Sequence, residues 1–412
     1  MKSIPATLQT TYANLLQAHV NRPVFAFEGA PFTRKLGNRT YWYANHRTAP
    51  GAPLKQRYLG IDSEEMRTRI DKMQTQRQGQ ADFRSYTSGL VALLRAGGIA
   101  GPDRKTGPML RTLANSGAFR LGAVLVGTHA FRHYDLTLGT HLSETSGWAT
   151  QTDDIDIAGF EKHAIAVPDS VDPDLAKQLE KLGFKPELTL NRKPSTSWIL
   201  ADASYAIDFL TPSVRDEEGP VDMPALKMWA QGLHFLDFLI ADPIDAVTPY
   251  MEGLLVKIPL PERYAVHKLI ISQRRKSGSA KAKKDLEQAR AIIWAMAEDR
   301  PYEIHKAVAD ADAKGPAWRK ALDKALDLEI FPDHPTPSGD SAEFLGRAKT
   351  IGAPVRLRIA GTALAVLFGG DQGTLAIANA NRSVIEALFR RQFRRQPGPD
   401  ILIGSSDVPD LS

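Results

Sequence analysis

The residues that could do chemistry are two aspartates in an alternating apolar run, Asp154-Ile155-Asp156-Ile157-Ala158. Side chains at i and i+2 of a β-strand leave the same face of the sheet. This spacing predicts that Asp154 and Asp156 point the same way while the two isoleucines enter the core. Mg²⁺ prefers carboxylate oxygens in octahedral geometry and keeps several waters. The run therefore predicts a divalent-metal site.

A third carboxylate is expected to complete that site. Asp208 lies in the apolar run 205–210, where an unpaired charge would be costly. Two divalent ions about 3.5–4 Å apart can activate an attacking oxygen and stabilise a leaving one in nucleotidyl transfer. We expect Asp154, Asp156 and Asp208 to hold two Mg²⁺ ions, with Mn²⁺ as an alternative. An Asp-x-Asp pair alone is a weak signal, because it is common in loops and at strand ends.

A turn before the aspartate pair gives it more weight. Residues 121–126 predict a short strand that ends at Gly127-Thr128, and His129 begins a helix. Backbone amides and a hydroxyl at the start of a helix can bind phosphate oxygens. A turn, an Asp-x-Asp strand and a later Asp thus follow one another along the chain, and together they are a stronger signal than the aspartate pair alone.

This ordered set resembles the DNA polymerase beta superfamily of nucleotidyltransferases, whose pattern is a Gly-Gly or Gly-Ser turn, an Asp-x-Asp strand and a later lone Asp. More closely, residues 119–284 resemble a poorly characterised family of bacterial nucleotidyltransferase-fold proteins. The matching segments are LGAVLVGTHAF (121–131), TDDIDIA (152–158) and PLPERYAVHKL (259–269). With the patch ending in Tyr58-Leu59-Gly60, the resemblance covers most of residues 25–300.

The resemblance implies that Asp154 and Asp156 bind the metals, that Asp208 completes the site, and that Gly127 and Thr128 hold the triphosphate. Related nucleotidyltransferases place a helical lysine near the phosphates, which makes Lys268 a candidate contact. The alternative for Lys268 is a solvated position on its helix. The sequence departs from the pattern in two ways: Thr128 replaces Gly or Ser, and a longer gap before the aspartate pair implies an inserted loop around residues 136–148.

The elements that must position these residues divide the chain into four parts. The predicted fold is α/β (α+β), with a mixed polymerase-beta-like sheet, a helical C-terminal part and β-containing terminal extensions. The expected domains are an N-terminal extension with a small β-sheet and helices (1–107), a catalytic domain (108–225), a helical domain (226–330) and a small α/β domain (340–412).

Individual elements follow from hydrophobic periodicity and turn residues. Strands are expected at residues 154–158, 164–168, 187–190, 197–200 and 205–210. From Asp222 the pattern is mainly helical, with helices over 261–273 and 280–297. After a linker at 331–339, strands are expected at 355–360, 362–368 and 374–378, then a helix capped by Ser383 and a loose tail after Pro397.

The N-terminal part interleaves basic and aromatic residues. Two strands are expected, at 39–45 and 54–60, followed by a helix from Asp62 to Gln76. The side chains in question are Arg34, Lys35, Arg39, Tyr41, Trp42, Tyr43, Arg47, Lys55, Arg57 and Tyr58. They suit stacking on nucleic-acid bases with neutralisation of phosphates. Aromatic packing on one face, with solvated basic residues on the other, is the alternative that we favour, because alternation alone cannot assign faces to partners.

Composition excludes several other classes of function. The 412 residues include no cysteine, which excludes disulfides, thiolate nucleophiles and cysteine-ligated zinc. The ten histidines have no paired spacing for zinc, and there is no Walker-type loop or serine nucleophile elbow. With no signal peptide and no apolar run of about 20 residues, a cytoplasmic protein without a membrane partner is expected. The net charge of +5 permits a polyanionic partner without requiring one.

The expected reaction is transfer of a nucleoside monophosphate from an NTP to an RNA, protein or small-molecule acceptor, with release of pyrophosphate. The resemblance to toxin and defence nucleotidyltransferases favours RNA or protein. A basic helical strip at 263–284 could guide an RNA acceptor or be ordinary helix surface, and the same two interpretations apply to the cluster at 390–395. The alternative function is a non-catalytic nucleic-acid-binding module, against which the three carboxylates argue.

Overall fold

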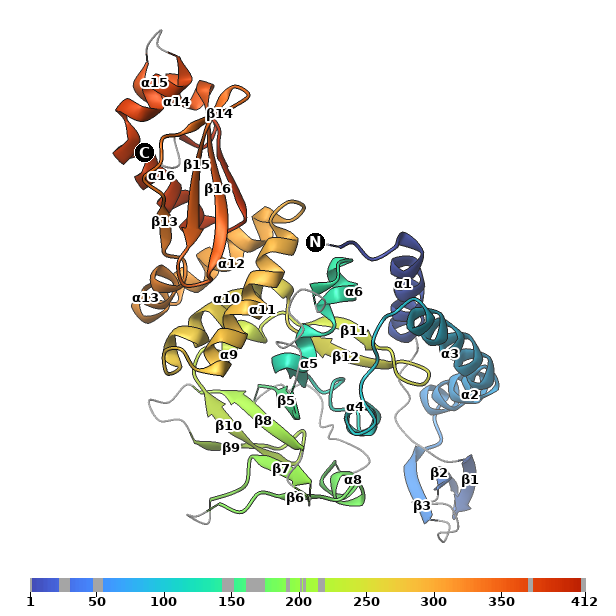
Figure 1. The fold of residues 1–412 in the computed structure, drawn as a ribbon. Coiled ribbons are helices and arrows are strands. Elements are labelled where there is room, and N and C mark those ends of the chain that lie inside the picture. Colours follow the sequence, from blue (N-terminus) through green and yellow to red (C-terminus); the bar gives the residue numbers. More distant parts are fainter. Residues whose placement is uncertain are drawn as a thin grey trace. The chain divides into compact units, whose positions relative to one another are not determined.

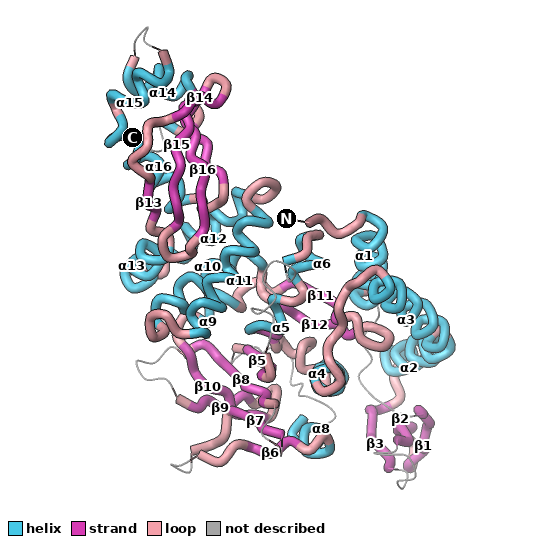
Figure 2. The backbone as a smooth tube through the Cα atoms, in the orientation of Figure 1, coloured by secondary structure: helices cyan, strands magenta, loops and turns pink. Residues whose placement is uncertain are grey.

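The structure is a computed structural model that describes residues 2–21, 30–46, 55–142, 152–160, 175–189, 193–200, 202, 205–213, 219–369 and 373–408. The chain forms two compact units, the first from residues 1–9, 103–246 and 256–412 and the second from residues 10–102 and 247–255. Figure 1 shows the elements in chain order, and Figure 2 separates helices from strands. No helix among these residues is long and apolar enough to cross a bilayer.

The first unit contains a mixed seven-stranded sheet. Its strands follow the order β4-β5-β8-β10-β9, and β6 and β7 extend it beside β8. Strand β5 is antiparallel to β4 and parallel to β8, and β8 is parallel to β10. The strands are β4 (Val124–Val126), β5 (Asp154–Ala158), β6 (Phe184–Pro186), β7 (Ser197–Leu200), β8 (Ala206–Pro212), β9 (Pro220–Met223) and β10 (Met228–Leu233). The predicted α/β class with a mixed sheet is confirmed.

The first unit also contains helices, some of which contact this sheet while others lie toward the C-terminal part of the unit (Figure 1). They are α4 (Thr106–Asn115), α5 (Gly127–Phe131), α6 (Tyr134–Leu138), α8 (Leu175–Lys181), α9 (Leu236–Leu239), α10 (Pro261–Arg274), α11 (Ala280–Met296), α12 (Pro301–Ala313) and α13 (Pro316–Ala325). Pro261 begins α10, where its fixed φ and missing N–H are tolerated. Ser279 caps α11, because its side chain accepts a hydrogen bond from the Ala282 amide. The expected helices at 261–273 and 280–297 are confirmed.

The chain between these helices and the aspartate strands holds more β-structure than expected. Strands β9, β10, β11 (Ile244–Thr248) and β12 (Leu254–Ile258) occupy a stretch predicted to be mainly helical from Asp222. Runs of four to six apolar residues fit either element, and sheet pairing decides between them. The strand expected at 187–190 is also wrong, since β6 ends at Pro186. The strand expected at 164–168 lies outside the described residues.

The C-terminal part of the first unit has its own sheet. It contains β13 (Leu328–Ile330), β14 (Thr336–Ser338), β15 (Ser341–Ala348), β16 (Ala353–Ala360) and β17 (Asp400–Ile403), with helices α14 (Gly361–Phe368), α15 (Thr374–Ala380) and α16 (Arg382–Arg395). The strands expected at 362–368 and 374–378 are wrong, because these Ala- and Leu-rich runs form α14 and α15. Asn381, not Ser383, precedes α16. The tail expected to be loose contains β17, which pairs with β16.

The arginines at the end of α16 are held within this unit. Arg394 forms ion pairs with Asp312 and Asp323, and Arg390 pairs with Glu386. Arg395 donates a hydrogen bond to His305. These contacts join Arg394 and Arg395 of α16 to α12 and α13.

The second unit combines a small sheet with helices. Its elements are most of α1 (Ala6–Val20), then β1 (Ala30–Leu36), β2 (Arg39–His46), β3 (Lys55–Ile61), α2 (Glu64–Gln78) and α3 (Gln80–Ala96). The strands form an antiparallel meander in the order β1-β2-β3. The Tyr12 hydroxyl of α1 accepts a hydrogen bond from the Val247 amide, which fastens residues 247–255 to this unit.

Candidate functional site

The three predicted aspartates lie on one face of the seven-stranded sheet that contains β5 and β8. In the register of β5 and β8, Asp156 pairs with Asp208, and Asp154 lies two residues before Asp156. The neighbouring Ile155, Ile157, Ile207 and Phe209 are at most 1% exposed, so they fill the opposite face. Because adjacent strands are about 4.8 Å apart, the sheet brings the carboxylates together as the i, i+2 spacing predicts.

Asp208 is held from its other side by a residue that the sequence did not single out. Ser197 of β7 is the antiparallel register partner of Asp208. Its hydroxyl donates a hydrogen bond to Asp208 Oδ1 over 2.5 Å. Asp208 therefore lies between Asp156 and Ser197, and the serine fixes one of its carboxylate oxygens.

The electrostatics of this face favour a cation. Burial, and then the charge of Asp208, raise the pKa of Asp156 to about 6. The same two causes raise the pKa of Asp154. Lys268 and Lys281 act in the opposite direction on Asp156. The carboxylates repel one another in a site with restricted water, so binding of a positive ion would relieve a real electrostatic cost.

The turn before the aspartate strand is built around Asp156. Gly127 follows β4, begins α5 and has a φ of +62°. A Cβ atom added there would lie 2.0 Å from Asp156 Oδ2. Glycine is therefore required twice, by the left-handed backbone and by the close approach of the carboxylate. The predicted turn and aspartate pair are in direct contact.

Thr128 is turned away from open solvent. It is 6% exposed, and its hydroxyl accepts a hydrogen bond of 3.4 Å from Gln288 Nε2 of α11. The Tyr264 hydroxyl lies 2.9 Å from both the Gly127 carbonyl and Gln288 Oε1, and its single proton can serve one of them at a time. Tyr264 and Gln288 thus brace the turn, and sequence reasoning missed both.

Lys268 is part of a buried ion-pair cluster. Its Nζ lies 2.6 Å from Asp285 Oδ1, and Arg275 Nε lies 2.5 Å from Asp285 Oδ2. The side chain of Lys268 is only 13% exposed, so the solvated position considered for it is wrong. Burial would raise the pKa of Asp285, but Lys268 and Arg275 outweigh it and lower that pKa. Asp285 holds the ammonium group of Lys268 in place, and the positive charge of Lys268 lowers the cost of ionising Asp156.

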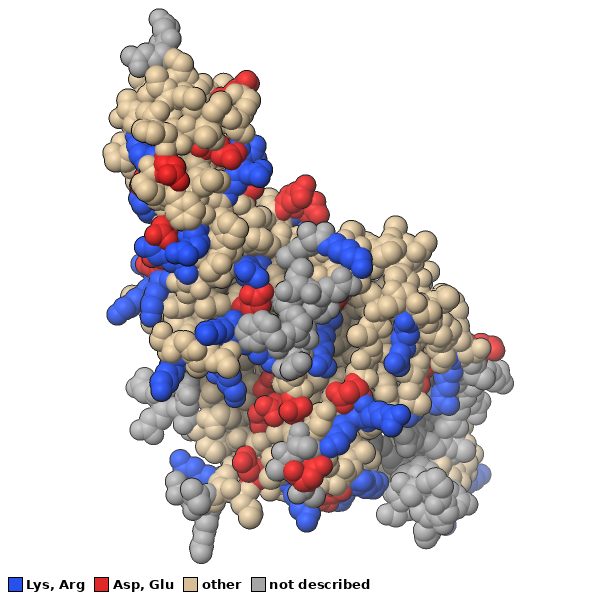
Figure 3. All heavy atoms as spheres, in the orientation of Figure 1, with Lys and Arg blue, Asp and Glu red and all other residues tan. Residues whose placement is uncertain are grey.

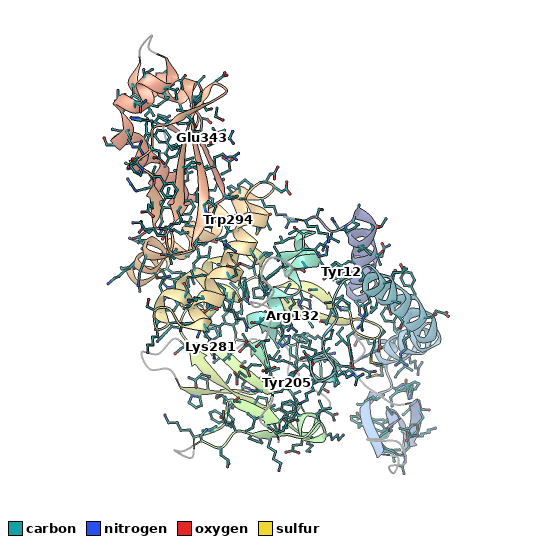
Figure 4. All side chains as sticks on the ribbon, in the orientation of Figure 1. Tyr12, Arg132, Tyr205, Lys281, Trp294 and Glu343 are labelled. Atoms are coloured by element: carbon teal, nitrogen blue, oxygen red, sulfur yellow. The ribbon has the colours of Figure 1, made fainter. Side chains whose placement is uncertain are left out.

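Two lysines of α11 also face the acids. The positive charge of Lys281 offsets part of the rise in the pKa of both Asp154 and Asp156, and the charge of Lys284 does the same for Asp154. Burial, followed by the charge of Lys268, lowers the pKa of Lys284 itself. Figure 4 shows Lys281 where the helices meet the strands of the sheet, and Figure 3 shows acidic and basic side chains grouped beside one another on the surface. Part of the basic strip at 263–284 therefore belongs to this site.

The donor set suits magnesium by its chemistry. Asp154, Asp156 and Asp208 offer the hard carboxylate oxygens that Mg²⁺ prefers. Burial and the charge of Asp208 raise the pKa of Asp156, and a bound cation would offset both effects. Within the described part of the chain, no group of three or more His, Asp or Glu side chains forms a ready metal cage as it stands. The carboxylates share a face, and their side chains would have to turn to a common ion.

A separate cavity lies at the far end of β8. It has a volume of about 400 Å³ and is lined by Pro212, Ser213, His234, Phe235, Asp237, Arg274, Lys314, Gly315, Pro316, Ala317 and Trp318. None of the three aspartates lines it. The cavity is therefore a feature separate from the carboxylate site.

Comparison with known proteins agrees with this arrangement. No curated protein and no solved structure is significantly similar to the chain. A family model described as nucleotidyltransferase matches residues 104–312, a little over half of the chain. The match includes the turn, the three aspartates, the lysines of α10 and α11, and the residues that brace them. The chain therefore belongs to this family of nucleotidyltransferases.

Proposed function

We propose that the protein transfers a nucleoside monophosphate from an NTP to an acceptor in a metal-dependent reaction that releases pyrophosphate. The observation that carries the proposal is the register of β5 and β8, which places Asp154, Asp156 and Asp208 on one face beside Gly127. In such a reaction, the acceptor oxygen bonds to the α-phosphorus as the bond from that phosphorus to pyrophosphate breaks. The acceptor loses one proton.

The three aspartates would hold two Mg²⁺ ions, with Mn²⁺ as an alternative. When bound, such ions neutralise phosphate charge and lower the cost of forming a nucleophilic oxygen. The raised pKa values of Asp154 and Asp156 support this role, since burial and then the charge of Asp208 raise them and a cation would offset both effects. Asp208, whose Oδ1 is fixed by Ser197, is our candidate to take the proton of the acceptor.

The positive side chains around the acids would bind the triphosphate. Lys268 is held in place by Asp285, and Lys281 and Lys284 lie on the adjacent helix α11. Gly127 allows the turn to approach Asp156 without a side chain in between. Because the Thr128 hydroxyl faces Gln288, we assign the triphosphate contact of Thr128 to its backbone. These charges would orient the leaving pyrophosphate away from the acceptor.

Three acceptor classes fit this chemistry: an RNA 3′ end, a protein side chain and a small molecule. The second candidate function is a nucleic-acid-binding module without activity. The three clustered carboxylates weigh against it, because a protein that only binds polyanions would bind them better without this negative charge.

The proposal is tested by incubating the protein with Mg²⁺, each labelled NTP and total RNA or cell lysate, then separating RNA, protein and small molecules. We expect label in one fraction from the native chain and none from Asp154→Ala/Asp156→Ala. Asp153→Ala is the matched control, since Asp153 is an exposed neighbour that precedes β5. Equal labelling by the double variant would refute the metal-site assignment. RNA binding without incorporation by any form would support the binding module.

A further inference from the structure

One face of the small sheet in the second unit carries a cluster of aromatic rings. Phe32 and Tyr43 are register partners, as are Tyr43 and Tyr58. Their ring centroids are 5.8 Å and 5.6 Å apart, and Tyr41 lies 6.1 Å from Tyr58. Residues that alternate along a strand share a face, so the four rings form one patch.

The opposite face contacts the first turn of helix α2 and the residue Asp62 just before it. Ala44 is fully buried there, and Trp42 Nε1 donates a hydrogen bond to Asp62 Oδ1 over 2.8 Å. A Cβ atom at Gly60 would lie 2.7 Å from Met66 of α2. The aromatic patch lies on the other face, where Tyr58 is 53% exposed and Phe32, Tyr41 and Tyr43 are half-buried. Partly exposed aromatic rings that adjoin one another can form a binding surface.

The segment that contains these strands carries positive charge and no negative charge. Residues 30–61 contain six Lys or Arg and no Asp or Glu. Arg34 is the register partner of Tyr41, and Arg39 is two residues before Tyr41 on β2, so both lie on the aromatic face. Both arginines are exposed. The alternative in which aromatic and basic residues occupy opposite faces is therefore wrong for Arg34 and Arg39.

We propose that this aromatic face, defined by Phe32, Tyr41, Tyr43, Tyr58, Arg34 and Arg39, binds single-stranded nucleic acid. Bases would stack on the tyrosines, and the arginines would neutralise the phosphates between them. An acidic peptide would use the arginines but offer no bases to the rings, and a duplex keeps its bases stacked on one another. The combination of rings and positive charge without a single acidic residue fits an unpaired strand best. The proposal goes beyond the proposed reaction and does not depend on it.

The test measures anisotropy of fluorescein-labelled 12-nucleotide oligo(U) and oligo(A), as RNA and as DNA, on the full chain. We expect salt-sensitive binding that weakens at least tenfold in Tyr41→Ala/Tyr58→Ala. Tyr41→Phe/Tyr58→Phe keeps the rings and is expected to bind as the native chain does, which separates stacking from misfolding. Tyr86→Ala on α3 is the matched control, because Tyr86 is also 53% exposed.

The salt dependence of binding tests the arginines separately from the aromatic rings. In Arg34→Gln/Arg39→Gln, the slope of log affinity against log salt is expected to become shallower by about 1.4, since each phosphate contact to a single strand contributes about 0.7. Unchanged binding in both the Tyr→Ala and the Arg→Gln pairs would overturn the proposal, as would equal affinity for a duplex or for polyglutamate. Asp154→Ala/Asp156→Ala is expected to retain full binding, so failure of the catalytic proposal and failure of this one give different results.

Discussion

Asp156 and Asp208 are register partners on the parallel strands β5 and β8, and their carboxylates leave the same face of the sheet side by side. Ionising Asp156 therefore costs both burial and repulsion from Asp208. A protein keeps such a pair when a cation or a proton occupies the space between them. This relationship connects the fold to the proposed chemistry, and it has consequences for pH, for the turn at Gly127 and for the residues that brace the site.

Stability should depend on pH through Asp156. Its pKa is about 6 in the folded chain, against an ordinary value of 3.8, so the charged form destabilises the fold above pH 6 and the effect vanishes below about pH 4. Without divalent ions, Asp156→Asn is expected to raise Tm at pH 7.5, with a difference that shrinks as the pH falls from 6 to 4. A lower Tm for Asp156→Asn at every pH would contradict this explanation.

Replacement of Gly127 should harm both the fold and the site. Gly127→Ala adds a methyl group 2.0 Å from Asp156 Oδ2 and places alanine at a φ of +62°. Gly278→Ala is the matched control, because Gly278 has a φ of +74° and no atom within 4 Å of its added Cβ. We expect Gly278→Ala to lower the free energy of unfolding by about 1 kcal/mol with activity retained. Gly127→Ala should cost more and reduce nucleotide incorporation at least tenfold; equal effects of the two changes would contradict the contact.

The Tyr264 hydroxyl is expected to matter for activity as well as stability. Tyr264→Phe removes the group that lies between the Gly127 carbonyl and Gln288. Tyr134→Phe is its control, since Tyr134 is equally buried and donates to the Pro259 carbonyl instead. Each change should cost about 1 kcal/mol in denaturant unfolding. Only Tyr264→Phe should raise the KM for NTP, and a matching rise in Tyr134→Phe would show that the turn is not braced by this hydroxyl.

Asp285 should contribute far more to stability than an exposed acid with a similar partner. Asp285→Asn leaves Lys268 and Arg275 without their shared carboxylate, which is 4% exposed, and should cost about 3–5 kcal/mol. Asp237→Asn breaks an ion pair with Lys314 whose two side chains are each 41% exposed, and should cost less than about 1 kcal/mol. Urea unfolding measures both. Similar values for the two variants would show that Lys268 is not fixed by Asp285.

Local sequence patterns predicted which strands carry the three aspartates and that Asp154 and Asp156 share a face. The i, i+2 spacing of Asp154 and Asp156 places both on one face, and the apolar neighbours of Asp208 predict its strand. Pro261 and Ser279 begin helices where proline and a capping hydroxyl are expected. These features depend on residues within a few positions of one another, which is the range over which periodicity is informative.

Residues that support the site from distant elements could not be found in this way. Ser197, Tyr264 and Gln288 carry no motif, and their roles depend on which strand or helix packs beside the turn. A weak signal exists on α11, where positions 281, 284, 285 and 288 recur at helical spacing and share a face. In the C-terminal part, the runs at 362–368 and 374–378 were predicted as strands because short apolar runs fit either element, and their surroundings make them helices.

The central claim, that the three aspartates support transfer of a nucleoside monophosphate, is tested most directly by the fate of two labels in one NTP. The native chain with Mg²⁺ is given the NTP labelled either at the α- or at the γ-phosphorus, beside Asp208→Asn and a sample with EDTA. We predict that the α-label joins the acceptor while the γ-label leaves as pyrophosphate, and that Asp208→Asn and EDTA each abolish both events. Transfer of the γ-label to the acceptor, or α-label transfer that persists in Asp208→Asn, would contradict the account.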